Sequence, residues 1–204
     1  MAKRILLAGV LGGVALFVWG GLSHMMLGLG QVGIKELPQE EYLLSNLRSS
    51  ISQPGFYFFP GAGMRPGATA EEKKAAQAEF MRKYSSGPYG ILIFHPEGTQ
   101  PMSAGQLGRE LGLNIVQALI AAWLLSFATG LSSFASRLGF VFGVGILAAI
   151  TTNVEYWNWY GFPANYTGAY ILDKLIGFLI VGLVVASLVK PATLRPPIVI
   201  NKAA

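Results

Sequence analysis

Four long apolar stretches divide the chain into segments of membrane length. They cover residues 5–29, 111–131, 138–154 and 171–189. A transmembrane helix needs about 20 predominantly apolar residues to cross a hydrocarbon layer of about 30 Å. Each stretch is long enough, and we expect the third helix to continue to about residue 159 at the membrane interface. The pattern therefore predicts an α-helical integral membrane protein with about four transmembrane helices.

The segment between the first two stretches, residues 30–103, is too long for a plain loop. Apolar positions at helical spacing predict a helix with Pro38 in its first turn. A capping-box pattern that starts at Thr69 predicts a second helix. Two short apolar runs, residues 56–59 and 91–94, predict strands that pair antiparallel, with the second helix as their connection. The segment is thus a small α+β cap, which must rest on helices, lipid or a partner because isolated two-stranded pairing is marginal.

These patterns predict four parts. The first stretch resembles a signal peptide in having a basic start, but it is long and no convincing cleavage site follows, so we interpret it as an uncleaved helix. Ser103 is expected to cap the helix that follows the cap. The predicted parts are transmembrane helix 1 (residues 1–29), the extracytoplasmic cap (30–103), a three-helix transmembrane region (104–190) and a cytoplasmic tail (191–204).

The distribution of charge predicts the orientation. The chain is 52% hydrophobic and only 12% charged, whereas soluble domains average about 25% charged residues. The chain start, the turn at residues 132–137 and the tail contain Lys and Arg but no Asp or Glu, which predicts that both termini are cytoplasmic and residues 30–103 extracytoplasmic. The asymmetry and the lack of a targeting sequence favour the inner (plasma) membrane of a bacterial cell. The basic residues on the predicted cytoplasmic side are Lys3, Arg4, Arg137, Lys190, Arg195 and Lys202.

Several kinds of chemistry are not expected. The net charge of +5 comes from the predicted cytoplasmic segments, so it indicates topology and no nucleic-acid partner is expected. The chain has no cysteine, which excludes disulfides, thiolate zinc sites, iron–sulfur ligation and cysteine nucleophiles. Neither a phosphate-binding loop nor a nucleophile elbow is present. The two histidines, His24 and His95, lie far apart in sequence, and no metal site is predicted.

Polar residues within membrane helices are costly and often functional, which makes His24 a candidate. It lies near the outer end of the first helix. A histidine there can ligate a haem or the magnesium of a chlorophyll, or it can anchor the helix at the headgroup level. The sequence leaves both interpretations open and identifies no cofactor.

A second group of candidates lies at the outer ends of the third and fourth helices. Asn153, Glu155 and Trp157 end the third helix, and Asp173 and Lys174 begin the fourth. Because the two helices are antiparallel neighbours with a short connection, a contact between Glu155 and Lys174 is geometrically easy. The group is either an interfacial ion pair with snorkelling side chains or a polar pocket, walled by aromatic residues, that binds a quinone headgroup or another amphipathic ligand.

Small and polar residues predict contacts between helices. Gly9 and Gly13 form a small-xxx-small pair on the first helix, and Asn114 and Gln117 share one face of the second. Small residues let helices approach closely, and polar ones hydrogen-bond to a neighbouring helix. The small-residue spacing recurs at Gly139/Gly143 and Gly182/Ala186.

Three functions are compatible with these features. The leading expectation is a non-catalytic accessory or structural subunit of a larger membrane complex, with membrane lipids and other membrane protein subunits as partners. The Pro-rich residues 191–200 are expected to form an extended strap on such a partner. One alternative is a membrane protein that binds a small molecule, lipid or quinone, or a transporter component. The other is a membrane enzyme acting on a lipid-soluble substrate through Glu155, Asp173 and His24, although we expect no catalytic activity.

Overall fold

The computed structural model describes residues 1–191, and within them four helices are long and apolar enough to cross a membrane. This finding and the small α+β segment between the first two of these helices confirm the predicted fold class. The chain is therefore a multi-pass membrane protein. The candidate spans are Ala2–Met26, Ala104–Phe127, Phe134–Tyr160 and Ala164–Leu188. Apart from Pro191, the predicted strap lies outside the described residues.

Two of the spans contain a π-helical turn. The first span is α1 (Ala2–Gly21) followed by η1 (Leu22–Met26), and a short 3₁₀ turn η2 (Leu29–Gln31) comes next. The third is α5 (Phe134–Ala149), η3 (Ile150–Val154) and α6 (Glu155–Tyr160). The other two are the single helices α4 (Ala104–Phe127) and α7 (Ala164–Leu188).

The described chain forms two compact units. The first comprises Met1–Ile34, Pro101–Trp157 and the chain from Phe162 on, and it holds most of the four spans. The second comprises Lys35–Gln100 and Asn158–Gly161, and it holds the α+β segment.

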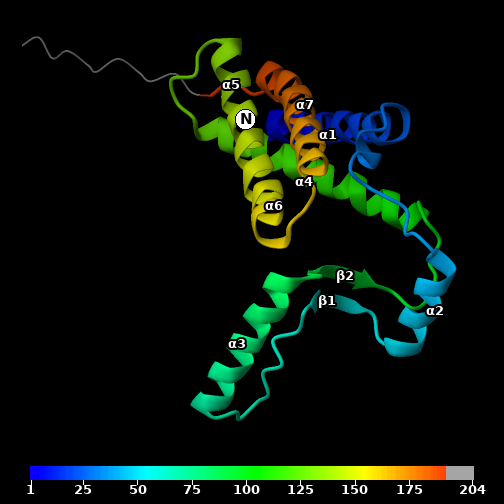
Figure 1. The fold of residues 1–204 in the computed structure, drawn as a ribbon. Helices are drawn as coiled ribbons and strands as arrows, with labels where there is room; N and C mark the ends of the chain where they lie inside the picture. Colours follow the sequence, from blue (N-terminus) through cyan, green and yellow to red (C-terminus); the bar gives the residue numbers. More distant parts are fainter. Residues whose placement is uncertain (192–204) are drawn as a thin grey trace, which may run out of the picture. The chain divides into compact units, whose positions relative to one another are not determined.

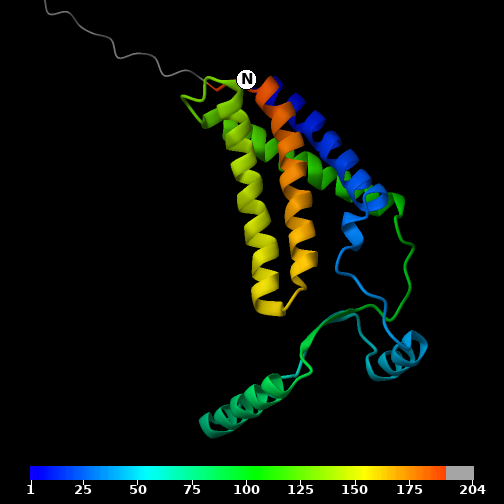
Figure 2. The ribbon, with the colours of Figure 1, turned by 45° about the horizontal axis from the view of Figure 1, so that its top comes forward.

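In the first unit, α1 packs against both α4 and α7, and α7 also packs against α5. Figure 2 shows α7 (orange) running beside α5 (yellow). The predicted close approach at Gly9 and Gly13 is present, because a Cβ atom on Gly13 would clash with the backbone of Ile115 in α4. Gly139 and Gly143, by contrast, have open space beside them. Close backbone packing of α1 on α4 therefore depends on glycine, as expected for helices in lipid.

Arg137 joins α5 to the end of α7. Its side chain is 6% exposed, its Nε atom donates to the Ala186 carbonyl at 3.0 Å, and its Nη1 atom donates to the Ser132 carbonyl at 2.6 Å. The last carbonyls of a helix lack intrahelical partners and carry partial negative charge. The buried guanidinium thus donates to a carbonyl near the C-terminus of α7. This hydrogen bond replaces one that the guanidinium would make to water.

The second unit confirms the predicted strands and their pairing. Strand β1 (Gly55–Phe59) runs beside β2 (Gly90–Phe94) (Figure 1). The pairing is antiparallel, with Gly55 opposite Phe94. Helix α3 (Ala70–Ser86) connects them, and α2 (Glu40–Ser50) precedes them.

The predicted helix starts are correct at two places and wrong at one. Thr69 forms the capping box of α3, and the Ser103 hydroxyl accepts from the backbone N–H of Gln106 at the start of α4. Pro38 was expected in the first turn of α2, but that helix begins at Glu40. The reason is Gln39, whose left-handed backbone (φ 53°) interrupts right-handed helix geometry.

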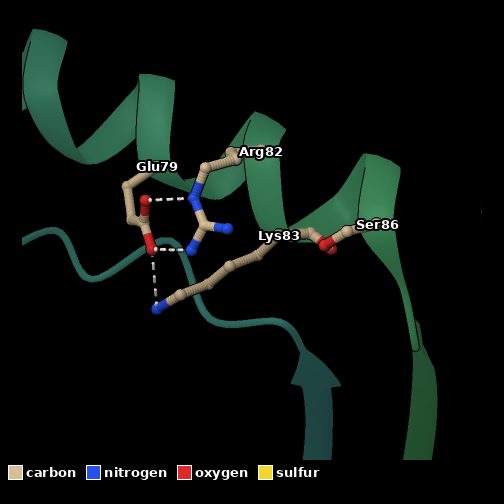
Figure 3. A network of polar contacts seen from close by, with 4 residues as sticks. All are labelled: Glu79, Arg82, Lys83 and Ser86. Atoms are coloured by element: carbon tan, nitrogen blue, oxygen red, sulfur yellow. Dashed lines mark hydrogen bonds and ion pairs between the residues drawn. The ribbon is translucent and has the colours of Figure 1, made fainter.

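A small network of charged residues lies on the surface of α3 (Figure 3). The Glu79 carboxylate accepts two hydrogen bonds of 2.8 Å from Arg82 and lies 3.5 Å from the Lys83 ammonium. The hydrogen bond from Arg82 is the main reason that the pKa of Glu79 falls from its usual 4.5 to about 2. The same bond raises the pKa of Arg82.

Candidate functional site

A pocket of about 530 Å³ lies within the first unit, between the end of α1 with η1, the start of α4 and the start of α7. Apolar side chains such as Phe17, Met25 and Leu107 form part of its wall. The polar residues of the wall come from all three helices. They are His24, Glu110, Asn114, Tyr170, Asp173 and Lys174.

Asp173 is the most deeply buried acid of the described residues, at 7% exposure. Its Oδ1 atom is buried and has no hydrogen-bond partner. Trp19 donates to the backbone carbonyl of Asp173 at 3.1 Å, which fixes this turn of α7 against α1 without using the carboxyl group. A buried carboxyl oxygen without a donor is strongly unfavourable. Asp173 lines the pocket, and a donor group on a ligand that reached this oxygen would satisfy it.

His24 lies in the π-helical turn η1 and is held in one orientation. Its Nδ1 atom is 3.0 Å from the Gly20 carbonyl and 2.9 Å from the Ser23 hydroxyl oxygen. A carbonyl only accepts, so the contact with Gly20 is a hydrogen bond in the tautomer that carries a proton on Nδ1. Single π-helical turns are frequent at functional sites. His24 thus places a second polar side chain at the pocket wall.

Aromatic rings extend from the pocket along the start of α7. The His24 ring meets Tyr170 edge to face, with ring centroids 5.9 Å apart. Tyr170 stacks on Tyr166 at 4.3 Å, Tyr166 meets Phe162 at 5.4 Å, and Phe162 stacks on Tyr156 at 5.5 Å. These four tyrosine and phenylalanine rings therefore form one continuous row that ends at the pocket.

Asn114 is 4% exposed and lines the pocket from α4. Its Oδ1 atom accepts from the Nε2 atom of Gln117 at 3.3 Å. The sequence predicted hydrogen bonds from these two residues to a neighbouring helix, but their bond lies within one helix. Since they are three residues apart, their side chains are neighbours on the same face.

Three predicted site residues lie outside the pocket. Asn153 donates to the Ala149 carbonyl of its own helix at 3.0 Å, while Glu155 and Trp157 are exposed. The ion pairs of the described residues involve Glu79 alone among the acids, so the expected contact between Glu155 and Lys174 is not formed. The π-helical turn η3 explains part of this result, because its wider turn changes the face on which the following residues emerge.

The sequence did not predict that His24 and Asp173 line the same pocket. Both residues were placed at the outer ends of their helices and hence at one depth, but nothing in the sequence pairs the first helix with the fourth. Tyr170 was also overlooked as a site residue, although its spacing of three from Asp173 puts the two on one helix face.

Comparisons with known protein families, curated proteins and solved structures find no match to this chain. Its chemistry must be inferred from its own residues. Within residues 1–191, no group of three or more His, Cys, Asp or Glu side chains is arranged to hold a metal ion. The pocket combines a buried carboxyl group, an oriented imidazole and a lysine with an apolar wall, an arrangement suited to binding an amphipathic molecule.

Proposed function

We propose that this membrane protein binds a lipid-soluble small molecule whose polar head donates a hydrogen bond, in the pocket between α1, α4 and α7. The observation that carries the proposal is the Asp173 carboxyl group, which is buried at the pocket wall with an oxygen that lacks a donor. A hydroxyl or amino group of the ligand would supply that donor. His24 and Lys174 would bind other polar atoms of the same head.

The size and lining of the pocket support this class of ligand. Small-molecule sites commonly enclose about 300–1,000 Å³ and combine apolar walls with a few polar groups that fix orientation. Here Phe17 and Leu107 would contact a ring or chain, and Asp173 would orient the head. A quinol is one molecule with these properties, since it joins ring hydroxyls to an apolar tail.

Native mass spectrometry of protein extracted gently from its membrane tests the proposal. The wild type is expected to carry a non-protein molecule that Asp173→Leu loses. Asn153→Leu is the matched control, because Asn153 is a polar residue within a span but outside the pocket, and this variant should retain the molecule. Identical bound molecules in all three proteins would refute the proposal.

We further propose that both termini are cytoplasmic and that residues 30–103 are extracytoplasmic, in the inner (plasma) membrane of a bacterial cell. The charge distribution supports this orientation. Because the chain has no cysteine, single cysteines report on each side without background. A membrane-impermeant maleimide added to cells with a permeabilised outer envelope should label Thr99→Cys and not Ser132→Cys. The reverse labelling would overturn the orientation.

An accessory subunit of a larger complex is the second candidate. Gly139 and Gly143 of α5 are exposed, and no atom lies within 4 Å of the position that a Cβ would take. Such a pair allows close approach of a helix from another subunit. On a blue-native gel the wild type should migrate with partner chains and Gly143→Ile should not. Migration of the wild type as a lone monomer would count against this candidate.

A further inference from the structure

The two-stranded sheet of the second unit has apolar side chains on both of its faces. Successive side chains of a strand point to opposite faces. An antiparallel sheet that faces water on one side normally alternates apolar and polar residues, and this sheet has no such polar face. One face carries Phe56, Phe58, Ile91 and Ile93, and the other carries Tyr57, Phe59, Leu92 and Phe94.

Helix α3 covers only one end of the first face. The Phe58 ring stacks on Tyr84, with ring centroids 6.3 Å apart, and lies 6.5 Å from the ring of Phe80. At the other end Phe56 and Ile93 are cross-strand partners. The Phe56 ring meets the Tyr160 ring edge to face, with ring centroids 6.1 Å apart, but Phe56 and Ile93 remain 56% and 65% exposed. Two strands alone are marginally stable in water, so a cover over this exposed pair would stabilise the sheet.

The chain itself keeps the exposed pair near the membrane. Strand β2 ends at Phe94 and α4 begins at Ala104, ten residues later. Ten extended residues reach at most about 36 Å. Helix α4 has 24 residues, and a helix of that length spans about 36 Å. The hydrocarbon layer is only about 30 Å thick. We therefore place the first turn of α4 at the membrane interface. The sheet therefore cannot move far from the lipid surface.

Charge favours a neutral lipid surface as the cover. Residues 35–100 contain seven Lys or Arg and seven Asp or Glu, so this segment has no formal net charge. Electrostatic attraction to anionic lipid is then weak, and apolar contact must dominate. Aromatic side chains favour the boundary between headgroups and acyl chains.

We propose that the end of the sheet formed by Phe56 and Ile93 docks into the headgroup–acyl boundary of the membrane that holds the four helices. The lipid covers the apolar pair, and docking holds the second unit against the membrane surface. This inference does not depend on the pocket or its ligand.

Spin labels on single cysteines of the full-length protein test the docking in phosphatidylcholine nanodiscs. The labelled variants are Ile93→Cys and, as a control on the exposed surface of α3, Gln77→Cys. Molecular oxygen concentrates in lipid, whereas a nickel chelate stays in water. The Ile93 label is expected to collide more with oxygen and less with nickel than the Gln77 label does. A label at Phe56→Cys should give the same result as the label at Ile93→Cys. Agreement between the two variants would show that the result does not come from one substitution that disrupts the sheet.

Two results would overturn the proposal. Nickel collisions at both sheet positions that equal those of the Gln77 label would mean that the pair faces water. Protection of both positions from nickel and from oxygen would mean that protein covers them, whether the chain's own residues around Tyr160, a second copy of the chain or another subunit.

Discussion

Replacement of Asp173 by leucine should make the ligand-free protein more stable while it abolishes ligand binding. In the wild type the carboxyl group is buried, and its Oδ1 atom has no hydrogen-bond donor. An apolar side chain removes that unfavourable burial. Opposite effects on stability and binding are expected at a site that maintains an unfavourable arrangement for function.

The magnitude follows from the contacts of Asp173. Leaving a buried polar group unsatisfied costs about 1–3 kcal/mol, and more when the group is charged. The hydrogen bond from Trp19 ends on the backbone carbonyl of Asp173, so it survives the substitution. The adjoining pocket of about 530 Å³ provides room for the larger side chain. We therefore expect the free energy of unfolding to rise by about 1–3 kcal/mol.

Thr167→Val is the matched control. The Thr167 hydroxyl oxygen is also buried without a partner, but the residue does not line the pocket. Valine has a similar shape, so stability should rise by about 1 kcal/mol while ligand binding stays unchanged. Denaturant unfolding in detergent micelles, followed by tryptophan fluorescence, measures both variants. A marked loss of stability in ligand-free Asp173→Leu would refute the reasoning, because it would show that the carboxyl group has a favourable partner.

Three further predictions concern packing and charge. Gly13→Ala should lower the unfolding free energy by about 1–3 kcal/mol, since the added Cβ atom would meet the backbone of Ile115. Gly139→Ala is the control: it should leave the unfolding free energy unchanged or raise it by up to about 1 kcal/mol, because alanine has the higher helix propensity. Arg137→Met should lower the unfolding free energy by about 1.5–3 kcal/mol, because the buried hydrogen bond to the Ala186 carbonyl and the part-buried one to the Ser132 carbonyl lose their charged donor. The same unfolding assay measures all three variants. The pKa of Glu79 is lowered from 4.5 to about 2 on folding, so its ion pairs stabilise α3 fully above pH 4.5 and are lost as the pH falls toward 2. The carboxyl carbon signal of Glu79 in an NMR titration should accordingly move near pH 2, and a midpoint near 4.5 would contradict the ion pairs.

The sequence was sufficient for the spans and for much of the second unit, because those features depend on local patterns. Apolar length determines whether a helix can span a membrane. The capping box at Thr69 and the cap at Ser103 are set by side chains within three residues of each helix start. The start of α2 was misplaced because the left-handed conformation of Gln39 has no sequence signal comparable to glycine.

The candidate site could be predicted only in part, because it depends on which helices are neighbours. His24 and Asp173 were each recognised as costly polar residues at helix ends, and the structure brings them to one pocket. Glu155 was grouped with Asp173 because their helices are adjacent in sequence, but adjacency does not determine which face a side chain occupies. The buried Arg137 was interpreted only as a cytoplasmic charge, since its partner carbonyl at Ala186 is 49 residues away.

A high-resolution structure of the protein, purified in native lipid, tests the central claim most directly. We predict density for a non-protein molecule in the pocket between α1, α4 and α7, with a donor atom about 2.6–3.2 Å from the Asp173 carboxyl group. A pocket that holds only water, or one in which Lys174 has turned to pair with Asp173, would contradict the account.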